Sequence, residues 1–136
     1  MKVVSDFNSS VPSNFSDSLN ISIPSSSTVI LGEFELSVDK EGSNVVLKGT
    51  AGIQSFLGLP NVIINVLRNG NIIGSVDVST LAVNELRLAT FNIIDINAPI
   101  GYHTYTLTAQ RLNALLTQAN VIGPLTFTGT TVSPAL

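Results

Sequence analysis

Several residue types are absent or scarce in this chain of 136 residues, and each absence excludes a class of chemistry. There is no cysteine, which excludes disulfides and thiolate metal sites and leaves the redox compartment open. There is one histidine, whereas a zinc site normally needs several histidine or cysteine ligands. Tryptophan is absent and there are two tyrosines, which gives little support to a carbohydrate-binding module that stacks sugars on aromatic rings.

Charge is also scarce. Charged residues make up 11% of the chain, against roughly 25% in typical soluble domains. The six basic residues are scattered and the net charge is −3, so no basic patch for nucleic acid is expected. With 44% hydrophobic residues, the surface must expose Ser, Thr, Asn and some apolar side chains. Exposed apolar patches usually mark contacts with other chains, so self-association is the first functional expectation.

Long hydrophobic runs are missing as well. No run approaches the roughly 20 apolar residues that span a bilayer, and the first 18 residues lack the apolar core of a signal peptide. We therefore expect no membrane partner, and a protein that stays where it is made, is released by lysis, or has lost its signal from this sequence. The length suits one domain with a core of its own.

Two regions differ in composition and in residue pattern. Residues 1–17 are rich in Ser, Asn and Asp, and we interpret them as an extended arm. From residue 18 to residue 136, apolar and polar residues alternate with period 2, which predicts a β-sheet body. A disordered tail usually lacks large apolar residues because it buries nothing. The arm contains five that we predict to contact another subunit: Val3, Val4, Phe7, Val11 and Phe15.

The body predicts about eight strands separated by turns, with loops at 79–85 and 113–120 and no convincing helix. The pair Asn69-Gly70 joins two apolar runs and is typical of a type I′ hairpin. Strands of modest length with regular turns and long connections favour one all-β sandwich with a jelly-roll or Greek-key path, preceded by the arm.

Local patterns give finer predictions. In the segment 28–39 we expect one face to carry Ile30, Phe34, Leu36 and Val38, and the other Glu33, Glu35 and Ser37. Gly49 and Gly52 indicate a bulge or a close backbone approach. The apolar phase changes near Thr90, which predicts a bulge or a change of sheet there. Pro124 inside the last strand predicts an edge strand or a bulge.

No catalytic or metal site is expected. His103 shares its strand face with Tyr105, Leu107 and Ala109 in the segment GYHTYTLTA, which is typical of a structural residue beside a turn. No G-x-S-x-G elbow supplies a nucleophile. Glu33 and Glu35 lie on one strand, whereas the two acids of a glycosidase flank a cleft from separate elements. The segment DKEG at 39–42 lacks the ligand spacing of a calcium loop and fits a polar hairpin turn better. No cofactor is expected.

The arm suggests a way of assembling. Strand addition takes affinity from main-chain hydrogen bonds and register from inserted side chains, and an all-β body with a free edge is a suitable receptor. Contacts in which each arm enters the next subunit run head to tail and build a ring or an open filament. A tail that folds back on its own body is the alternative that the sequence leaves open.

Four segments in matching order resemble the exosporium protein C-like family of spore-forming Bacilli. They cover most of residues 45–130 and leave the arm uncovered: VVLKGTAGIQ, INVLRNGNIIGS, IGYHTYTLTAQRL and ANVIGPLTFTGT. The resemblance implies a jelly-roll subunit on the spore surface, made in the mother cell without a signal peptide. It offers no catalytic residues. It also implies similarity to subunits of endospore appendage fibres, some of which join through N-terminal connectors.

Together these expectations describe a non-enzymatic subunit that polymerises with itself on the spore surface, with other exosporium or collagen-like spore-surface proteins as further partners. The runner-up is a closed trimer of TNF- or C1q-like jelly rolls that acts as an adhesive or receptor-binding tip. Mass distinguishes the two, since a trimer stops at a fixed size and a fibre grows.

Overall fold

The computed structural model describes residues 1–78, 82–112 and 115–135, so parts of the predicted loops at 79–85 and 113–120 lie outside the described residues. All regular structure described is β-strand, and the described residues contain no helix that could cross a membrane. The described residues form nine strands where about eight were predicted, because most of the arm is itself a strand: β1 Lys2–Ser13, β2 Ile21–Ser22, β3 Val29–Val38, β4 Asn44–Leu57, β5 Val62–Arg68, β6 Asn71–Val78, β7 Leu86–Asp95, β8 Gly101–Arg111 and β9 Gln118–Pro134.

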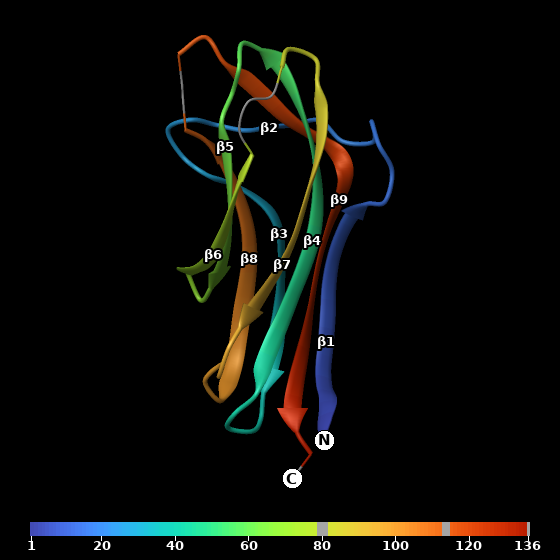
Figure 1. Cartoon of the computed structure of the whole chain (residues 1–136), viewed down its shortest axis with the longest axis vertical. Coiled ribbons are helices and arrows are strands. Elements are labelled where there is room, and N and C mark those ends of the chain that lie inside the picture. Colours follow the sequence, from blue (N-terminus) through green and yellow to red (C-terminus); the bar gives the residue numbers. More distant parts are fainter. Residues whose placement is uncertain (79–81, 113–114, 136) are drawn as a thin grey trace.

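The strands form two antiparallel sheets packed face to face (Figure 1). The five-stranded sheet has the order β1-β9-β4-β7, with β2 also paired to β9, and the four-stranded sheet has the order β3-β8-β5-β6. From β2 onward every connection crosses from one sheet to the other, except between β5 and β6. This strand order is that of a jelly roll, so the predicted fold class is confirmed.

The turn between β5 and β6 is the centre of this arrangement. Asn69 and Gly70 have φ angles of 50° and 85°, as a type I′ turn requires, which confirms the predicted hairpin. Outward from this turn, β4 pairs with β7, β3 with β8, and β1 and β2 with β9. The chain is therefore one long antiparallel hairpin that has been rolled into a sandwich.

The core lies between the sheets and is filled by alternate residues of both. Its centre is aromatic, with the ring centroids of Phe34 and Phe127 4.6 Å apart. The Phe91 ring lies 6.1 Å from that of Phe127, and the Tyr105 ring lies 6.2 Å from that of Phe34. Such tilted pairs add to the free energy gained from burial. Because Phe34 and Tyr105 come from the four-stranded sheet and the other two from the five-stranded sheet, the cluster joins the layers.

The prediction for Ile30 is wrong. The pairing of β3 with β8 shifts between Ile30 and Gly32, and a bulge of this kind moves the residues before it to the opposite face. Leu31 is therefore buried, whereas Ile30 is 60% exposed. Beyond the bulge the prediction is confirmed for the inward residues Phe34, Leu36 and Val38 and for the outward residues Glu33 and Glu35.

The irregularity predicted near Thr90 is also wrong. Strand β7 pairs with β4 without interruption from Asp95 to Leu86. The apparent change of phase arises because Leu86 and Leu88 point away from the core and are exposed, while Ala89 and Phe91 point inward. The outer face of the five-stranded sheet is therefore more apolar than a solvent-facing sheet usually is.

Two predictions about turns and edges need correction. Pro124 lies in β9, which is flanked by β1 and β4, so the predicted edge position is wrong. The predicted bulge is confirmed, since the pairing of β4 with β9 shifts between Ala51 and Ile53, opposite residues 121–125 of β9. The segment 39–42 is a turn, but it joins β3 to β4, which belong to different sheets. It is therefore a crossover and not the predicted hairpin.

Candidate functional site

The arm forms the edge strand β1 of the five-stranded sheet in this single chain. It runs antiparallel to β9, from Lys2 opposite Pro134 to Ser13 opposite Leu125, with two irregularities. The turn residues 14–17 follow, and β2 then pairs with the other half of β9. Figure 1 shows β1 beside β9 with the two chain termini close together. The arm is thus an ordered strand with one free edge.

The polar side chains of β1 bind the edge of the opposite sheet. Asp6 Oδ2 accepts a hydrogen bond from the Ser37 backbone N–H at 2.9 Å, and Asn8 Nδ2 donates to the Glu35 carbonyl at 3.1 Å. The Ser37 N–H and the Glu35 carbonyl both belong to β3, the edge strand of the four-stranded sheet. Backbone groups on that edge have no neighbouring strand to bind, and unpaired groups of this kind promote association. The arm therefore closes one side of the sandwich with side chains.

A serine cluster fastens the start of the arm. Ser5 Oγ lies 2.8 Å from Ser133 Oγ in β9, and Ser133 Oγ lies 2.8 Å from Ser43 Oγ. Ser43 in turn donates to the Lys40 carbonyl at 2.6 Å. Ser43 and Ser133 are fully buried, and buried hydroxyls need such partners. The cluster therefore holds β1, β9 and the crossover before β4 together.

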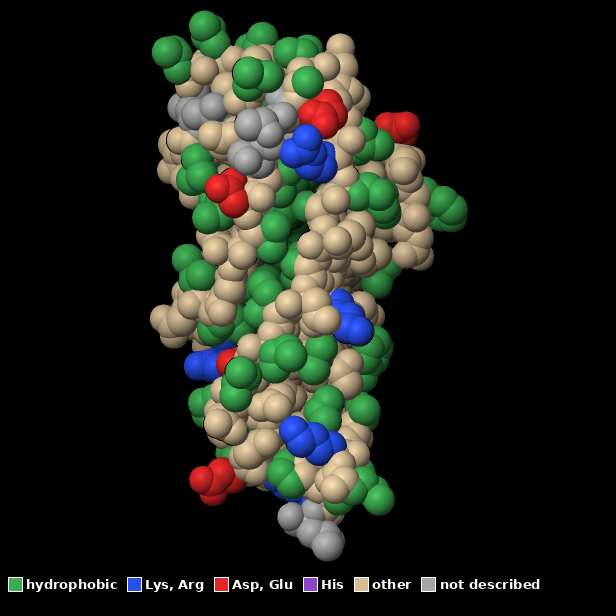
Figure 2. Space-filling view, in the orientation of Figure 1, with side chains coloured by type: hydrophobic (Ala, Val, Ile, Leu, Met, Phe, Trp, Pro, Cys, Tyr) green, Lys and Arg blue, Asp and Glu red, His purple; other side chains and the backbone are tan. Residues whose placement is uncertain are grey.

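The five predicted contact residues of the arm do not enter the core of this chain. Their side chains are 40–74% exposed: Val3, Val4, Phe7, Val11 and Phe15. Figure 2 shows a surface of mainly green and tan atoms with few charges. Sequence reasoning located these apolar residues but missed the functional role of Asp6 and Asn8. The available signal was their alternation with Phe7, which places polar and apolar side chains on opposite faces of one strand.

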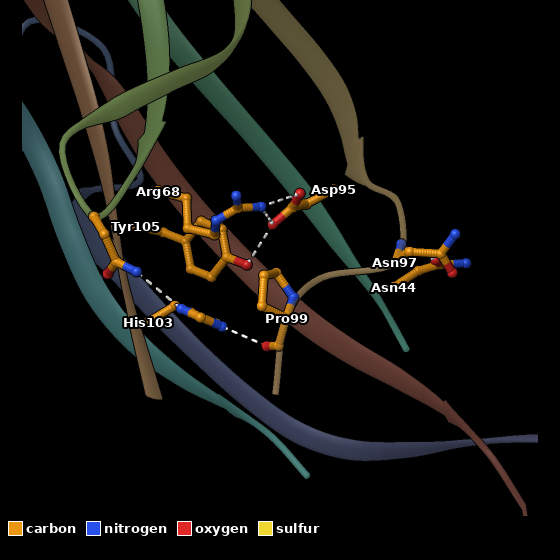
Figure 3. Close-up of polar contacts among 8 residues, drawn as sticks. Asn44, Arg68, Asp95, Asn97, Pro99, His103 and Tyr105 are labelled. Atoms are coloured by element: carbon orange, nitrogen blue, oxygen red, sulfur yellow. Dashed lines mark hydrogen bonds and ion pairs between the residues drawn. The ribbon is translucent and has the colours of Figure 1, made fainter. Parts of the chain in front are cut away.

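His103 is held in a hydrogen-bonded network through both of its ring nitrogens. Its Nδ1 lies 2.9 Å from Asn69 Nδ2, and its Nε2 lies 2.6 Å from the Pro99 carbonyl (Figure 3). These partners assign the proton to Nε2, since the Asn69 amide donates to Nδ1 and the carbonyl accepts. The ring is 7% exposed. His103 thus joins the β5–β6 turn to the segment before β8, in agreement with the predicted structural role.

The charged pair beside it joins the two sheets. Arg68 Nη1 donates to both carboxylate oxygens of Asp95, at 2.7 and 2.8 Å, and the Tyr105 hydroxyl donates to Asp95 Oδ2 at 2.8 Å (Figure 3). Asp95 is 7% exposed and belongs to the five-stranded sheet, whereas Arg68 and Tyr105 belong to the four-stranded sheet. Each of the three side chains binds another in the network, so the network holds the two sheets together.

This network predicts alkaline instability. Burial, with the hydrogen bond to Asp95, raises the pKa of Tyr105 far above its ordinary value near 10. The unfolded chain loses this proton above about pH 10, while the folded chain keeps it. The resulting stability is fully present below the unfolded pKa and falls as the pH rises beyond it, by up to about 1.4 kcal/mol per pH unit. Urea unfolding between pH 8 and pH 11.5 measures this slope.

Tyr105→Phe provides the control for that measurement. It removes the titrating hydroxyl and should make the loss of stability above pH 10 shallower by the same amount. An identical slope in both proteins, or tyrosinate absorbance from Tyr105 in the folded protein before unfolding begins, would contradict the prediction.

The carboxylates form no metal centre within the part of the chain that the structure describes. Glu33 is exposed and accepts a hydrogen bond from Thr106 Oγ1 at 2.8 Å. Among the described residues no three His, Cys, Asp or Glu side chains are grouped closely enough to hold a metal ion. Outside the sheets, the Glu85 carboxylate accepts from the Ala82 N–H at 2.7 Å, and this bond together with Arg87 lowers the pKa of Glu85. That contact only orders a loop.

Comparisons with known proteins leave the family open. No family model matches the chain, and no curated protein gives a significant match. Similar solved structures include a carbohydrate-binding module, CBM36, in complex with calcium and xylotriose, with 12% identity over 94% of this chain and 97% of that one and a TM-score of 0.43. Dimeric latent PorU from Porphyromonas gingivalis has 13% identity over 94% of this chain and 13% of that one, with a TM-score of 0.46.

A structure of infectious bursal disease virus, Gx strain, has 12% identity over 98% of this chain and 39% of that one, with a TM-score of 0.45. These likenesses are too distant to inform function. The assignment of the fold rests on the strand order of this chain.

Proposed function

We propose that the chain is a non-enzymatic structural subunit that self-assembles on the surface of bacterial endospores, in the exosporium or an appendage fibre. Residues 1–17 add a strand to the next subunit. The observation that carries the proposal is the orientation of β1, whose polar side chains Asp6 and Asn8 bind the body while its apolar side chains, such as Phe7, face solvent. An apolar face on an edge strand favours association with another chain.

The contacts of β1 suit an exchange between subunits. All of its main-chain pairing is with β9, and its polar side chains bind β3. If the chain swings about residues 14–20, the same bonds form with the body of a neighbouring copy. Exchange of an identical element is a low-cost route to assembly, and head-to-tail exchange that does not close gives a filament. The sequence resemblance supports the spore surface as the location.

Negative-stain electron microscopy of the full chain and of a variant that lacks residues 1–17 tests the proposal. We expect filaments from the full chain and none from the truncated one. Discrete particles of one size from the full chain would contradict the filament and favour the closed trimer. Filaments from the truncated chain would show that the arm is not the connector.

A disulfide tests the exchange without removing a strand. The chain has no cysteine, and Ser5 Oγ and Ser133 Oγ are 2.8 Å apart across β1 and β9, so cysteines at these two positions would bring their sulfur atoms close together. Oxidation of assembled Ser5→Cys/Ser133→Cys should give a ladder of covalent oligomers on a non-reducing gel. Oxidation before assembly should lock the arm within its own chain and prevent filaments. Ser5→Cys alone is the control and should give no ladder. Filaments whose crosslink stays within single chains would overturn the exchange.

A further inference from the structure

The two outer faces of the sandwich carry opposite charge. Along the described strands of the five-stranded sheet, the charged residues that project outward are Lys2 and Lys48. The other charged residues of these strands, Asp6, Arg87 and Asp95, lie on the inward side of their strands, and Asp6 and Asp95 bind partners there. Along the four-stranded sheet the outward charged residues are acidic: Glu33, Glu35 and Asp77.

The basic face is shaped around Lys48. One cross-strand row consists of Phe7, Thr130, Val46 and Ile94, and the next row places Lys48 between Thr128 and Asn92. Residues of both rows line a groove of about 380 Å³ that runs across β1, β9 and β4. Phe7 and Ile94 are 58% and 52% exposed. The groove therefore places the apolar side chains of Phe7, Val46 and Val132 beside one cationic side chain.

The acidic face is the complement of this surface. Glu33 and Glu35 project from β3, and Asp77 projects from β6 at the opposite edge of the same sheet. Exposed apolar side chains accompany them, with Ile30 at 60% and Tyr102 at 67% exposure. Neither face resembles the densely charged outer surface of an ordinary monomeric sandwich, and oppositely charged surfaces steer and align partners.

We infer that copies of this chain stack face to face, with the outer face of the five-stranded sheet of one copy against the acidic outer face of the four-stranded sheet of the next. Lys48 then faces Glu33 and Glu35 of its neighbour. The occupant is a second copy because the chain itself presents both complementary faces. Such a contact joins two different surfaces and propagates without closing. The inference rests on the proposed self-assembly and adds the side-by-side contact that the arm alone does not define.

Charge reversal tests this contact with folded proteins, since the side chains concerned are exposed. Lys48→Glu reverses the charge of this residue on the face of the five-stranded sheet and leaves the acidic face unchanged, so like charges would meet in the contact. In Glu33→Lys/Glu35→Lys both faces become basic. Each variant alone should need a protein concentration at least about tenfold higher than wild type for assembly, as measured by light scattering and sedimentation. An equimolar mixture should assemble again, since the reversed face of each variant matches the reversed face of the other, and the two unchanged faces also match.

Glu41→Lys is the matched control, because it makes the same kind of charge change as Glu33→Lys at an exposed residue of the crossover before β4, outside both outer faces, and should assemble as wild type does. Wild-type assembly by either single-face variant would overturn the stacking, and so would a mixture that fails to recover. Both results leave the arm exchange standing. Failure of the wild-type chain to assemble at all would instead overturn the proposed function.

Discussion

Asp95→Ala is expected to lower the free energy of unfolding by about 3 kcal/mol. The change leaves Arg68 without the carboxylate that it binds at 2.7 and 2.8 Å, and it leaves the fully buried Tyr105 hydroxyl without an acceptor. Removal of one partner from a buried ion pair costs about 3–5 kcal/mol because a charge stays buried and unpaired. The lower end applies because the Arg68 side chain is 25% exposed and water can reach it. Urea unfolding at pH 7 measures the change.

Two further variants separate the causes. Asp95→Asn keeps an acceptor for the Tyr105 hydroxyl and removes the charge, so it should cost less than Asp95→Ala. Arg68→Met in the Asp95→Ala background removes the unpaired cation and should recover part of the lost stability, a coupling that a double-mutant cycle reports. A free energy of unfolding of Asp95→Ala that differs from wild type by less than about 0.5 kcal/mol is typical of a surface substitution. That result would show that the network does not join the sheets as described.

The jelly roll was predictable because its strands obey period 2 and its central turn has a specific chemistry. Asn69-Gly70 adopts the positive φ angles that few other pairs tolerate, and this one turn fixes the partners of β5 and β6. Errors arose where a strand breaks its own alternation. The bulge after Ile30 depends on how β3 meets β8. The available signal in β3 was Gly32 at the bulge, since glycine inside a strand often marks one.

The change of apolar phase near Thr90 was a poor guide to β7, because its apolar residues lie on both faces of a regular strand. Leu86 and Leu88 project from the outer face, whereas Phe91 points inward. The same excess of apolar residues was the signal for association. Asp95 shares its alternation with Phe91, and Arg68 shares its own with Val66. A carboxylate and a guanidinium on buried faces imply a pair, although only the fold shows that the two strands face each other.

The arm was predictable as a segment and not in its contacts. Its apolar residues were identified from spacing, whereas Asp6 and Asn8 gained meaning only when the edge of β3 was found beside them. That edge belongs to the other sheet, and sequence periodicity contains no information on which edges of two sheets lie together. The site therefore depends on tertiary structure to a greater degree than the fold does.

Gly52→Ala is expected to destabilise the protein by about 3 kcal/mol, the upper part of the range for overpacking a core. A Cβ at Gly52 would lie 2.1 Å from the carbonyl oxygen and 2.6 Å from the carbonyl carbon of Gly123. Both atoms are backbone of the β9 bulge, so β4 and β9 would have to move apart, which confirms the close approach predicted at Gly52. Gly→Ala also lowers the conformational entropy of the unfolded chain, which by itself stabilises a protein by about 0.4–1 kcal/mol. The clash must outweigh this gain in stability.

Gly32→Ala is the matched control for this prediction, because it is the same substitution at a buried strand position. Its Cβ would meet Ser10 Oγ at 3.0 Å, Ser10 Cβ at 3.3 Å and Phe127 Cβ at 3.5 Å. The Ser10 hydroxyl can rotate away, and the contact with Ser10 Cβ needs only a small shift of the edge strand β1. We expect a change within about 1 kcal/mol there, measured by the same urea titration. Equal stability losses at Gly32 and Gly52 would show that the approach of β4 to the bulge of β9 is not a constraint on the fold.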